Sequence, residues 1–231
     1  MDYKHDFKND EFADKYIFKH KQNGYFVEIG ACDGITSSQC YFFENNLNWD
    51  GIAIEPQKRF RNQMIKNRKN PYFKCLGNKN GVVNFTESNN YGLSGVTEIQ
   101  YNHENYEPHK NGWRDSGFIR YDVEMTTLLN VLDENNSPHL IDYIGMDCEG
   151  SEYNILEHYF NNNTKYLVKF MCIEIGRNDI NELVKKNDYI ELINPLLPLC
   201  DGQIVTWEKY FIHKSEINNI DNKLIKYKST F

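Results

Sequence analysis

The sequence lacks any apolar stretch long enough to cross a membrane. A transmembrane helix needs about 18 or more consecutive apolar residues, and no such run occurs in the 231 residues. The opening residues, MDYKHDFKNDEFADKY, are charged throughout, without the apolar segment or cleavage site of a secretory signal. We therefore expect a soluble, cytoplasmic protein with no membrane span.

Cysteine motifs and an excess of positive charge are also missing. The six cysteines form no CxxC pair and no Cys/His spacing typical of a zinc finger, so no zinc site is expected and reduced thiols are favoured. Asp and Glu number 33 against 26 Lys and Arg, which sets the formal net charge at -7. Such a surface repels polyanions. Nucleic acid is therefore disfavoured as the main partner, although a local basic groove stays open.

The sequence does contain a regular alternation of strand-like and helix-like segments. Strands are predicted at 25–30, 51–54, 72–76, 140–147 and 167–175. Helices are predicted at 57–69, 126–132, 151–159 and 180–186. Parallel neighbours in a sheet need a crossover helix between them, so this order predicts an α/β fold with helices on both faces of a parallel sheet. Residues 1–23 are interpreted as an N-terminal helical extension.

Residues 86–122 interrupt this rhythm. The stretch is polar and rich in aromatic residues, Trp113 and Tyr121 among them, and it shows no sustained hydrophobic period. Long insertions in a compact domain are usually functional or mobile. We interpret it either as a lid with flat surfaces for a polyhydroxylated acceptor or as a loop or hairpin packed on the domain.

A glycine turn follows the first predicted strand, in the sequence Glu28-Ile29-Gly30-Ala31-Cys32-Asp33-Gly34. Glycine lets the backbone approach a ligand, and a helix that begins after the turn offers free N–H groups. The spacing between Gly30 and Gly34 does not match the G-x-G-x-x-G fingerprint of dinucleotide sites. The turn therefore predicts a polar ligand that is not a pyrophosphate.

Acidic residues follow three of the predicted strands. Glu55 ends the second strand, where an acid meets ribose hydroxyls in nucleoside-binding sheets. Asp147 and Glu149 end the fourth strand and Glu174 ends the next. Crowded carboxylates have raised pKa values or share a cation, and either arrangement suits a site that takes a proton from a hydroxyl. The simpler alternative, acids favoured at a helix N-terminus, accounts better for Glu152 than for Asp147.

Four segments together resemble the FkbM-type methyltransferases, a branch of the class I S-adenosylmethionine-dependent enzymes. These segments are GYFVEIGACDGITSSQCYFFE, GIAIEP, TTLLNVL and IDYIGMDCEGSEYNILE. The resemblance covers roughly residues 24–175. It implies a Rossmann-like class I methyltransferase fold for residues 24–231, with a mostly parallel seven-stranded sheet, helices on both faces and an antiparallel C-terminal strand.

The same resemblance implies roles for individual residues. The methionine end of the cofactor would be wrapped by Glu28, Gly30, Ala31, Asp33 and Gly34, and its carboxylate capped by Ser37 or Ser38. Glu55 would bind the ribose, Leu76 would flank the adenine, and Asp147 would lie beside the sulfonium and the acceptor. We predict Asp147 as the catalytic base, with Glu149 and Glu174 as the next candidates.

The predicted function is methyl transfer from S-adenosyl-L-methionine to a hydroxyl of a sugar, a glycan or a small natural product. A divalent cation at the carboxylates is an open alternative to their protonation, although the sequence contains no motif that identifies a metal site. Two other functions stay open: an RNA or cap 2'-O-methyltransferase, and a non-catalytic nucleoside-binding module with the same fold.

Overall fold

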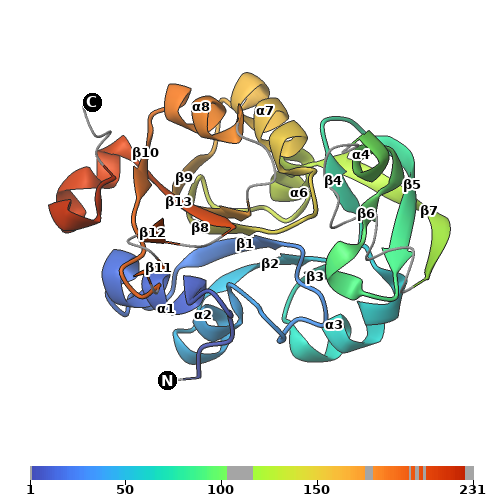
Figure 1. Cartoon of the computed structure of the whole chain (residues 1–231), viewed down its shortest axis with the longest axis horizontal. Coiled ribbons are helices and arrows are strands. Elements are labelled where there is room, and N and C mark those ends of the chain that lie inside the picture. The colour runs from blue at the N-terminus through green and yellow to red at the C-terminus, as the bar shows by residue number, and fades with distance from the viewer. Residues whose placement is uncertain are drawn as a thin grey trace.

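The computed structural model describes residues 2–102, 117–174, 179–197, 199–200, 203–204 and 207–226. A seven-stranded sheet lies at the centre, in the strand order β10-β13-β9-β8-β1-β2-β3 (Figure 1). Its strands are β1 Tyr25–Ile29, β2 Asp50–Ile54, β3 Pro71–Tyr72, β8 Leu140–Met146, β9 Leu167–Glu174, β10 Tyr189–Leu192 and β13 Glu208–His213. Within these ranges, no helix is both long and apolar enough to cross a bilayer.

The pairing of the strands confirms the predicted sheet with one correction. The strand predicted at 72–76 is divided: Tyr72 joins this sheet through β3, whereas residues 75–77 pair in a second sheet. β9, β8, β1, β2 and β3 are parallel neighbours, whereas β13 runs antiparallel to both β9 and β10. The chain therefore has the mostly parallel sheet with an antiparallel C-terminal strand that is typical of class I methyltransferases. The carboxyl ends of four parallel strands and the start of β13 meet at one edge.

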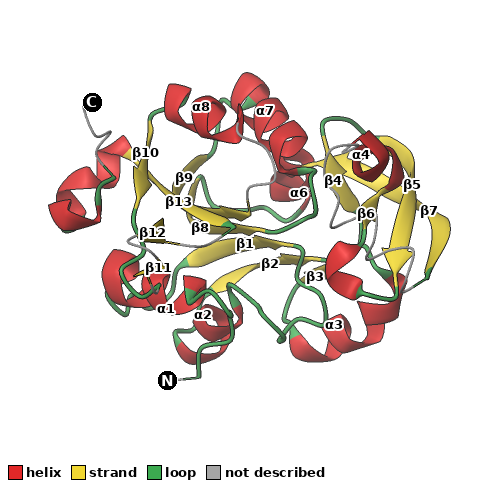
Figure 2. Ribbon diagram, in the orientation of Figure 1, coloured by secondary structure: helices red, strands yellow, loops and turns green. Residues whose placement is uncertain are grey.

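Helices cover both faces of the sheet (Figure 2). One face carries α6 Leu128–Glu134, α7 Glu152–Asn162 and α8 Asp179–Lys186. The other carries α1 Asn9–Phe12, a π-helix at Ala13–Phe18, α2 Tyr41–Asn46, the 3-10 turn Lys58–Phe60 and α3 Arg61–Asn67. The helix predicted to start at Thr126 starts instead at Leu128, because Thr127 caps it by accepting a hydrogen bond from the backbone N–H of Asn130.

The two faces of the sheet have different cores because side chains alternate along each strand. Val27 and Ile29 of β1 point into a mainly aliphatic core beneath α6, α7 and α8. Phe26 points into an aromatic core on the opposite face. The N-terminal helices are part of that second core, where the ring of Phe12 lies 5.0 Å from the ring of Tyr210.

A second, smaller sheet forms from the region after β3. Its strands are β4 Cys75–Gly77, β5 Gly81–Ser88, β6 Gly95–Val96 and β7 Phe118–Thr127, in the order β4-β7-β5-β6, and α4 Thr97–Asn102 lies beside them. The stretch 86–122 was predicted to be irregular, but its last residues, from Phe118 onward, belong to strand β7. The remaining elements are the ribbon β11 Leu199–Cys200 and β12 Gln203–Ile204, and the 3-10 helices Tyr91–Leu93, Lys214–Asn219 and Asn222–Leu224.

A buried ion cluster joins β1 to the helices below it. The guanidinium of Arg68 donates hydrogen bonds to the carboxylates of Glu28 and Glu44, and all three side chains are buried. Glu28 also accepts from Ser38 Oγ at 2.7 Å, and Glu44 accepts from the backbone N–H of Lys69 at 2.8 Å. The cluster thus fixes the end of β1 against α2 and the residue that follows α3.

Replacing Arg68 by methionine should destabilise the fold strongly. The substitution leaves two carboxylates buried without their counter-charge, and breaking a buried ion pair in this way costs about 3–5 kcal/mol. The exposed pair of Lys165 with Asp133 offers a control, because Lys165→Met removes a solvent-screened surface ion pair that contributes little to stability. Denaturant unfolding of both variants measures the difference, and equal losses would contradict the prediction.

Candidate active site

A pocket opens at the edge of the sheet where the parallel strands end. It is lined by residues at or just after the ends of β1, β2, β8 and β9, and one wall comes from the small sheet through Phe85 and Val96. Another wall comes from the start of the chain. The polar and charged side chains that line the pocket are His5, Asp6, Ser37, Glu55, Gln57, Ser94, Glu149, Ser151, Asp147, Glu174 and Glu208.

The glycine turn brings β1 and β8 into very close contact. Gly30 has a φ of +89°, and a Cβ atom built there would lie 1.7 Å from the carbonyl oxygen of Asp147. The backbone N–H of Asp147 donates to the carbonyl of Ile29 at 2.9 Å. Only glycine fits at position 30, because any side chain would meet backbone. The contact places the Asp147 side chain at the mouth of the turn.

Two acids of the turn stabilise its local structure. Asp33 accepts hydrogen bonds from the backbone N–H groups of Ile35 and Thr36 and from the Thr36 hydroxyl, at 2.7–2.9 Å. Glu28 is held by Arg68, by Ser38 and by the backbone N–H of Gln39. Both carboxylates are therefore engaged by the protein itself.

The predicted cofactor residues fall into two groups. The pocket is lined by Gly30, Ser37, Glu55, Leu76 and Asp147. Behind it lie Glu28, Ala31, Asp33, Gly34 and Ser38, where they shape the turn. The first group remains the prediction for direct contact with the cofactor.

Glu55 stands at the end of β2, facing the turn. Its carboxylate accepts hydrogen bonds from the backbone N–H groups of Cys32 and Gln57, both at 2.8 Å. Burial raises the pKa of Glu55 from 4.5 to about 7, although these hydrogen bonds oppose the shift. The carboxylate is positioned to accept hydrogen bonds from a ligand bound over the turn.

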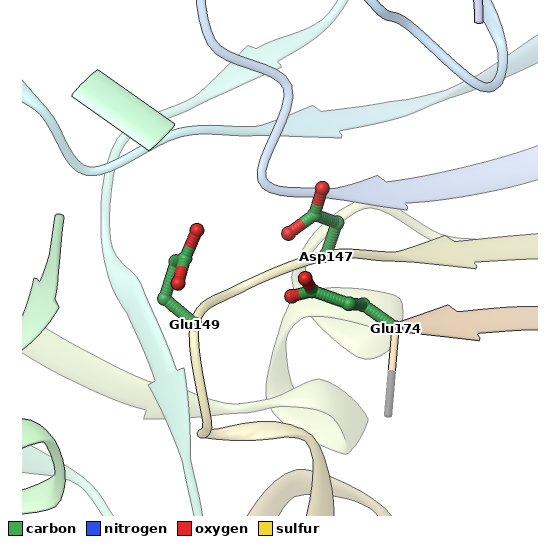
Figure 3. A group of neighbouring side chains, drawn as sticks. All are labelled: Asp147, Glu149 and Glu174. Atoms are coloured by element: carbon green, nitrogen blue, oxygen red, sulfur yellow. The ribbon is translucent and has the colours of Figure 1, made fainter. Parts of the chain in front are cut away.

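The carboxylate groups of Asp147, Glu149 and Glu174 lie close to one another (Figure 3). One carboxylate oxygen from each lies within 4.8 Å of the others. Burial and the facing carboxylate of Asp147 raise the pKa of Glu174 far above its ordinary value. Burial raises the pKa of Asp147 too, while a hydrogen bond with Glu174 opposes that rise. At neutral pH Glu174 therefore holds a proton that it shares with Asp147, and the pair has the character of a base with raised proton affinity.

The three carboxylates also match the ligand type that hard divalent cations prefer. Glu149 reaches the cluster because its backbone has a φ of 58° and is followed by Gly150 at 100°. No Lys or Arg is among the described residues that line the pocket. Protons or a bound cation must therefore compensate the crowded negative charge.

Sequence reasoning missed the acid and the imidazole on the far side of the pocket. Glu208 is the first residue of β13 and pairs with Glu174 across the strands. His5 Nε2 lies 3.8 Å from Glu208 Oε1. Burial lowers the pKa of His5 to about 4 and raises that of Glu208 to about 8.

The sequence contains a pattern that could have predicted Glu208 as a site residue, but none that could have predicted His5. An antiparallel last strand begins at the edge where its parallel neighbours end, so its first residue lies beside the site. Glu208 occupies that position before the apolar run Tyr210–Ile212. His5 reaches the pocket through contacts that no local pattern in the sequence encodes.

The insertion contributes Gly92, Ser94 and Val96 to the pocket, and Phe85 of β5 lines the wall beside them. Tyr121 donates a hydrogen bond to Glu87 and accepts one from the backbone N–H of Lys58 at 3.0 Å. Trp113 and the other residues at 103–116 lie outside the described part of the chain, so the lid remains a prediction.

Comparison with known proteins gives the family. The sequence profile described as "Methyltransferase FkbM domain" matches residues 28–227, which is most of the chain. The chain belongs to the FkbM methyltransferase family. Membership implies S-adenosylmethionine as the methyl donor, and the turn and Glu55 offer the polar groups and close backbone approach that such a nucleoside needs. No protein of curated function matches the sequence.

Solved structures with a similar fold are distant methyltransferases. The METTL16 methyltransferase domain is 11% identical over 89% of this chain, with a TM-score of 0.42, and this chain spans 66% of its length. A precorrin-6y C5,15-methyltransferase from Geobacter metallireducens is 12% identical over 88% of this chain and 86% of its own, with a TM-score of 0.41. The human methyltransferase 10 domain containing protein is 12% identical over 84% of this chain and 73% of its own, with a TM-score of 0.37.

Glu55 gives a pH-dependent prediction for stability. In the folded protein the carboxyl group of Glu55 keeps its proton up to a pH of about 7, whereas in the unfolded chain the same group releases it near pH 4.5. The stability of the wild type relative to Glu55→Gln should therefore be highest below pH 4.5, fall between pH 4.5 and 7, and level off above. Each pKa unit corresponds to about 1.4 kcal/mol. Urea unfolding of both proteins from pH 4 to 8.5 measures this, and parallel curves would contradict it.

Proposed function

We propose that the protein transfers a methyl group from S-adenosylmethionine to a hydroxyl of a sugar, a glycan or a small natural product. The observation that carries this proposal is the arrangement of acids in one pocket. Glu55 follows β2, and Asp147 and Glu174 stand at the ends of β8 and β9, so the acids flank the glycine turn that follows β1. A ribose partner and a base are thus available to one bound ligand and its acceptor.

The proposed mechanism asks the protein for positioning and proton transfer. S-adenosylmethionine supplies a methyl group already activated on a sulfonium sulfur. Glu55 accepts hydrogen bonds from ribose hydroxyls, while Gly30 and Ser37 form the wall beside the methionine end. Placement of two reactants side by side contributes up to about 7–11 kcal/mol in ideal geometry. Asp147 accepts the proton of the acceptor hydroxyl, and the hydrogen bond with Glu174 holds its carboxylate in place.

The charge of the pocket favours an uncharged or cationic acceptor over an anionic one. Its described charged side chains are acidic, and the formal net charge of the chain is -7. A phosphate backbone would be repelled by both. This supports a hydroxyl of a sugar or natural product over the 2'-hydroxyl of an RNA or cap. A non-catalytic nucleoside-binding module would not need a carboxylate pair with raised pKa values beside the ligand.

Thermal shift measurements test cofactor binding. Saturation with S-adenosylmethionine or S-adenosylhomocysteine at about 100 times the Kd adds about 2.7 kcal/mol of stability, which raises the Tm by about 5–10 °C in a protein of this size. NAD should give no shift, because the turn does not match a pyrophosphate site. Stabilisation by NAD alone would contradict the proposed function.

Substitution of Asp147 tests the base. Screening a glycan and metabolite library with methyl-labelled cofactor identifies an acceptor for this assay. Asp147→Asn should keep the Kd for S-adenosylmethionine within a few-fold and lower kcat by roughly 10²–10⁴, because the amide cannot accept the proton. Glu157→Gln, an acid on α7 that accepts from Tyr153 outside the pocket, is the matched control. Unchanged turnover in Asp147→Asn would remove Asp147 from the role of base.

A chelator decides between a proton and a cation at the three carboxylates. We expect turnover to continue in EDTA, because the hydrogen bond between Asp147 and Glu174 already compensates part of their charge. Loss of turnover in EDTA that magnesium or manganese restores would instead assign a divalent cation to Asp147, Glu149 and Glu174.

A further inference from the structure

The methionine end of S-adenosylmethionine carries an α-ammonium group, whose N–H donors bind carbonyl and carboxylate oxygens, most strongly a carboxylate. The two acids of the glycine turn are the obvious candidates from the sequence. Both are engaged elsewhere: Glu28 by Arg68, Ser38 and a backbone N–H, and Asp33 by the turn itself. Neither carboxylate lines the pocket. A carboxylate partner for the ammonium group would therefore come from another part of the chain.

Asp6 is the acid that the structure brings to this end. It lines the pocket, and its Oδ2 accepts a hydrogen bond from Ser37 Oγ at 2.8 Å. Ser37 also lines the pocket and follows the glycine turn by three residues, with a φ of 51°. A carboxylate accepts up to about four hydrogen bonds, so the contact with Ser37 orients Asp6 without using its capacity.

The backbone on both sides of Asp6 is held in place. The N–H of Lys8 donates to the carbonyl of His5 at 3.0 Å, and the N–H of Phe7 donates to His5 Nδ1 at 3.2 Å. The backbone N–H groups of Lys4 and His5 donate to the carboxylate of the buried Asp10. Asp6 therefore sits at the tip of a closed turn whose base is anchored in α1.

The charge at this position suits an ammonium group. His5, the nearest titratable neighbour along the chain, is kept neutral at physiological pH because burial lowers its pKa to about 4. No Lys or Arg is among the described residues that line the pocket. Asp6 itself is exposed, and an ammonium–carboxylate hydrogen bond is stronger than a neutral one.

We propose that Asp6 binds the α-ammonium group of the cofactor, so that residues 5–7 form one wall of the cofactor site. This inference rests on the proposed function, because it needs an S-adenosyl ligand in the pocket. Ser37 acts as a positioning residue that holds the Asp6 carboxylate toward the glycine turn. The N-terminal segment is then a part of the binding site that lies outside the residues matched by the family profile.

Calorimetry with two thioether ligands tests the proposal without an acceptor. S-adenosylhomocysteine and 5'-methylthioadenosine share the adenosine and the sulfur, but only the first has the amino-acid group. In Asp6→Asn the Kd of S-adenosylhomocysteine should rise about tenfold or more, the effect of one charge-assisted hydrogen bond. The Kd of 5'-methylthioadenosine should stay within twofold. Asp2→Asn, on the same segment and paired only with Lys4 among its described contacts, should change neither.

The outcomes separate this inference from its alternatives. If Asp6 faced the ligand's carboxylate instead, Asp6→Asn would remove a repulsion and tighten the binding of S-adenosylhomocysteine. An unchanged Kd, or an equal loss for both ligands, would also overturn the assignment, the latter because it points to a general distortion of the pocket. Failure of the wild type to bind S-adenosylhomocysteine would refute the proposed function itself, which distinguishes the two failures.

Discussion

The ion cluster of Arg68 with Glu28 and Glu44 is the interaction on which the rest of the site depends. It lies directly under the glycine turn, where Arg68 also packs against Gly34 and donates to its carbonyl oxygen. By fixing the end of β1, it sets where the turn begins. The conformation of the turn then determines how close Gly30 comes to Asp147. That contact determines the position of the Asp147 carboxylate.

A second constraint is the concentration of acids at one edge of the sheet. Four strands deliver carboxylates to the same small volume, and the described lining offers no basic side chain to neutralise them. As a result, burial and the neighbouring carboxylates raise the pKa of these acids, and the pKa of Glu174 lies far above its ordinary value. A site of this kind accepts protons readily and repels anions, and both properties follow from burial and proximity.

Much of the fold could be predicted from the sequence because strands and turns are local patterns. The strands around Val27, Ile52 and Ile144 are short runs of apolar β-formers bounded by turn residues, and the structure places them as neighbours in the predicted sheet. The edge location of Glu55 and Asp147 followed from the rule that parallel strands end on the same side. These predictions needed no knowledge of tertiary contacts.

The sequence could not predict which residues of the turn line the pocket and which stabilise the turn itself. Glu28 has a residue type suited to a cofactor, yet its role depends on Arg68, forty residues later in the chain. The approach of His5 to Glu208 depends on how the N-terminal segment packs against β13. The strand β7, which pairs with β5, could not be predicted because its exposed face mixes polar residues with apolar ones such as Ile119.

The contact between the two ends of the chain has a consequence for the order of assembly. Tyr210 on β13 donates a hydrogen bond to Asn9 at a sequence separation of 201 residues, and its ring packs on Phe12. During synthesis the segment around Asn9 emerges 201 residues before its partner Tyr210. Contacts at such a separation form late because the entropy of closing the loop opposes them. The pocket is therefore completed only after β13 has been made, and a product truncated before β13 would have the glycine turn without its outer wall.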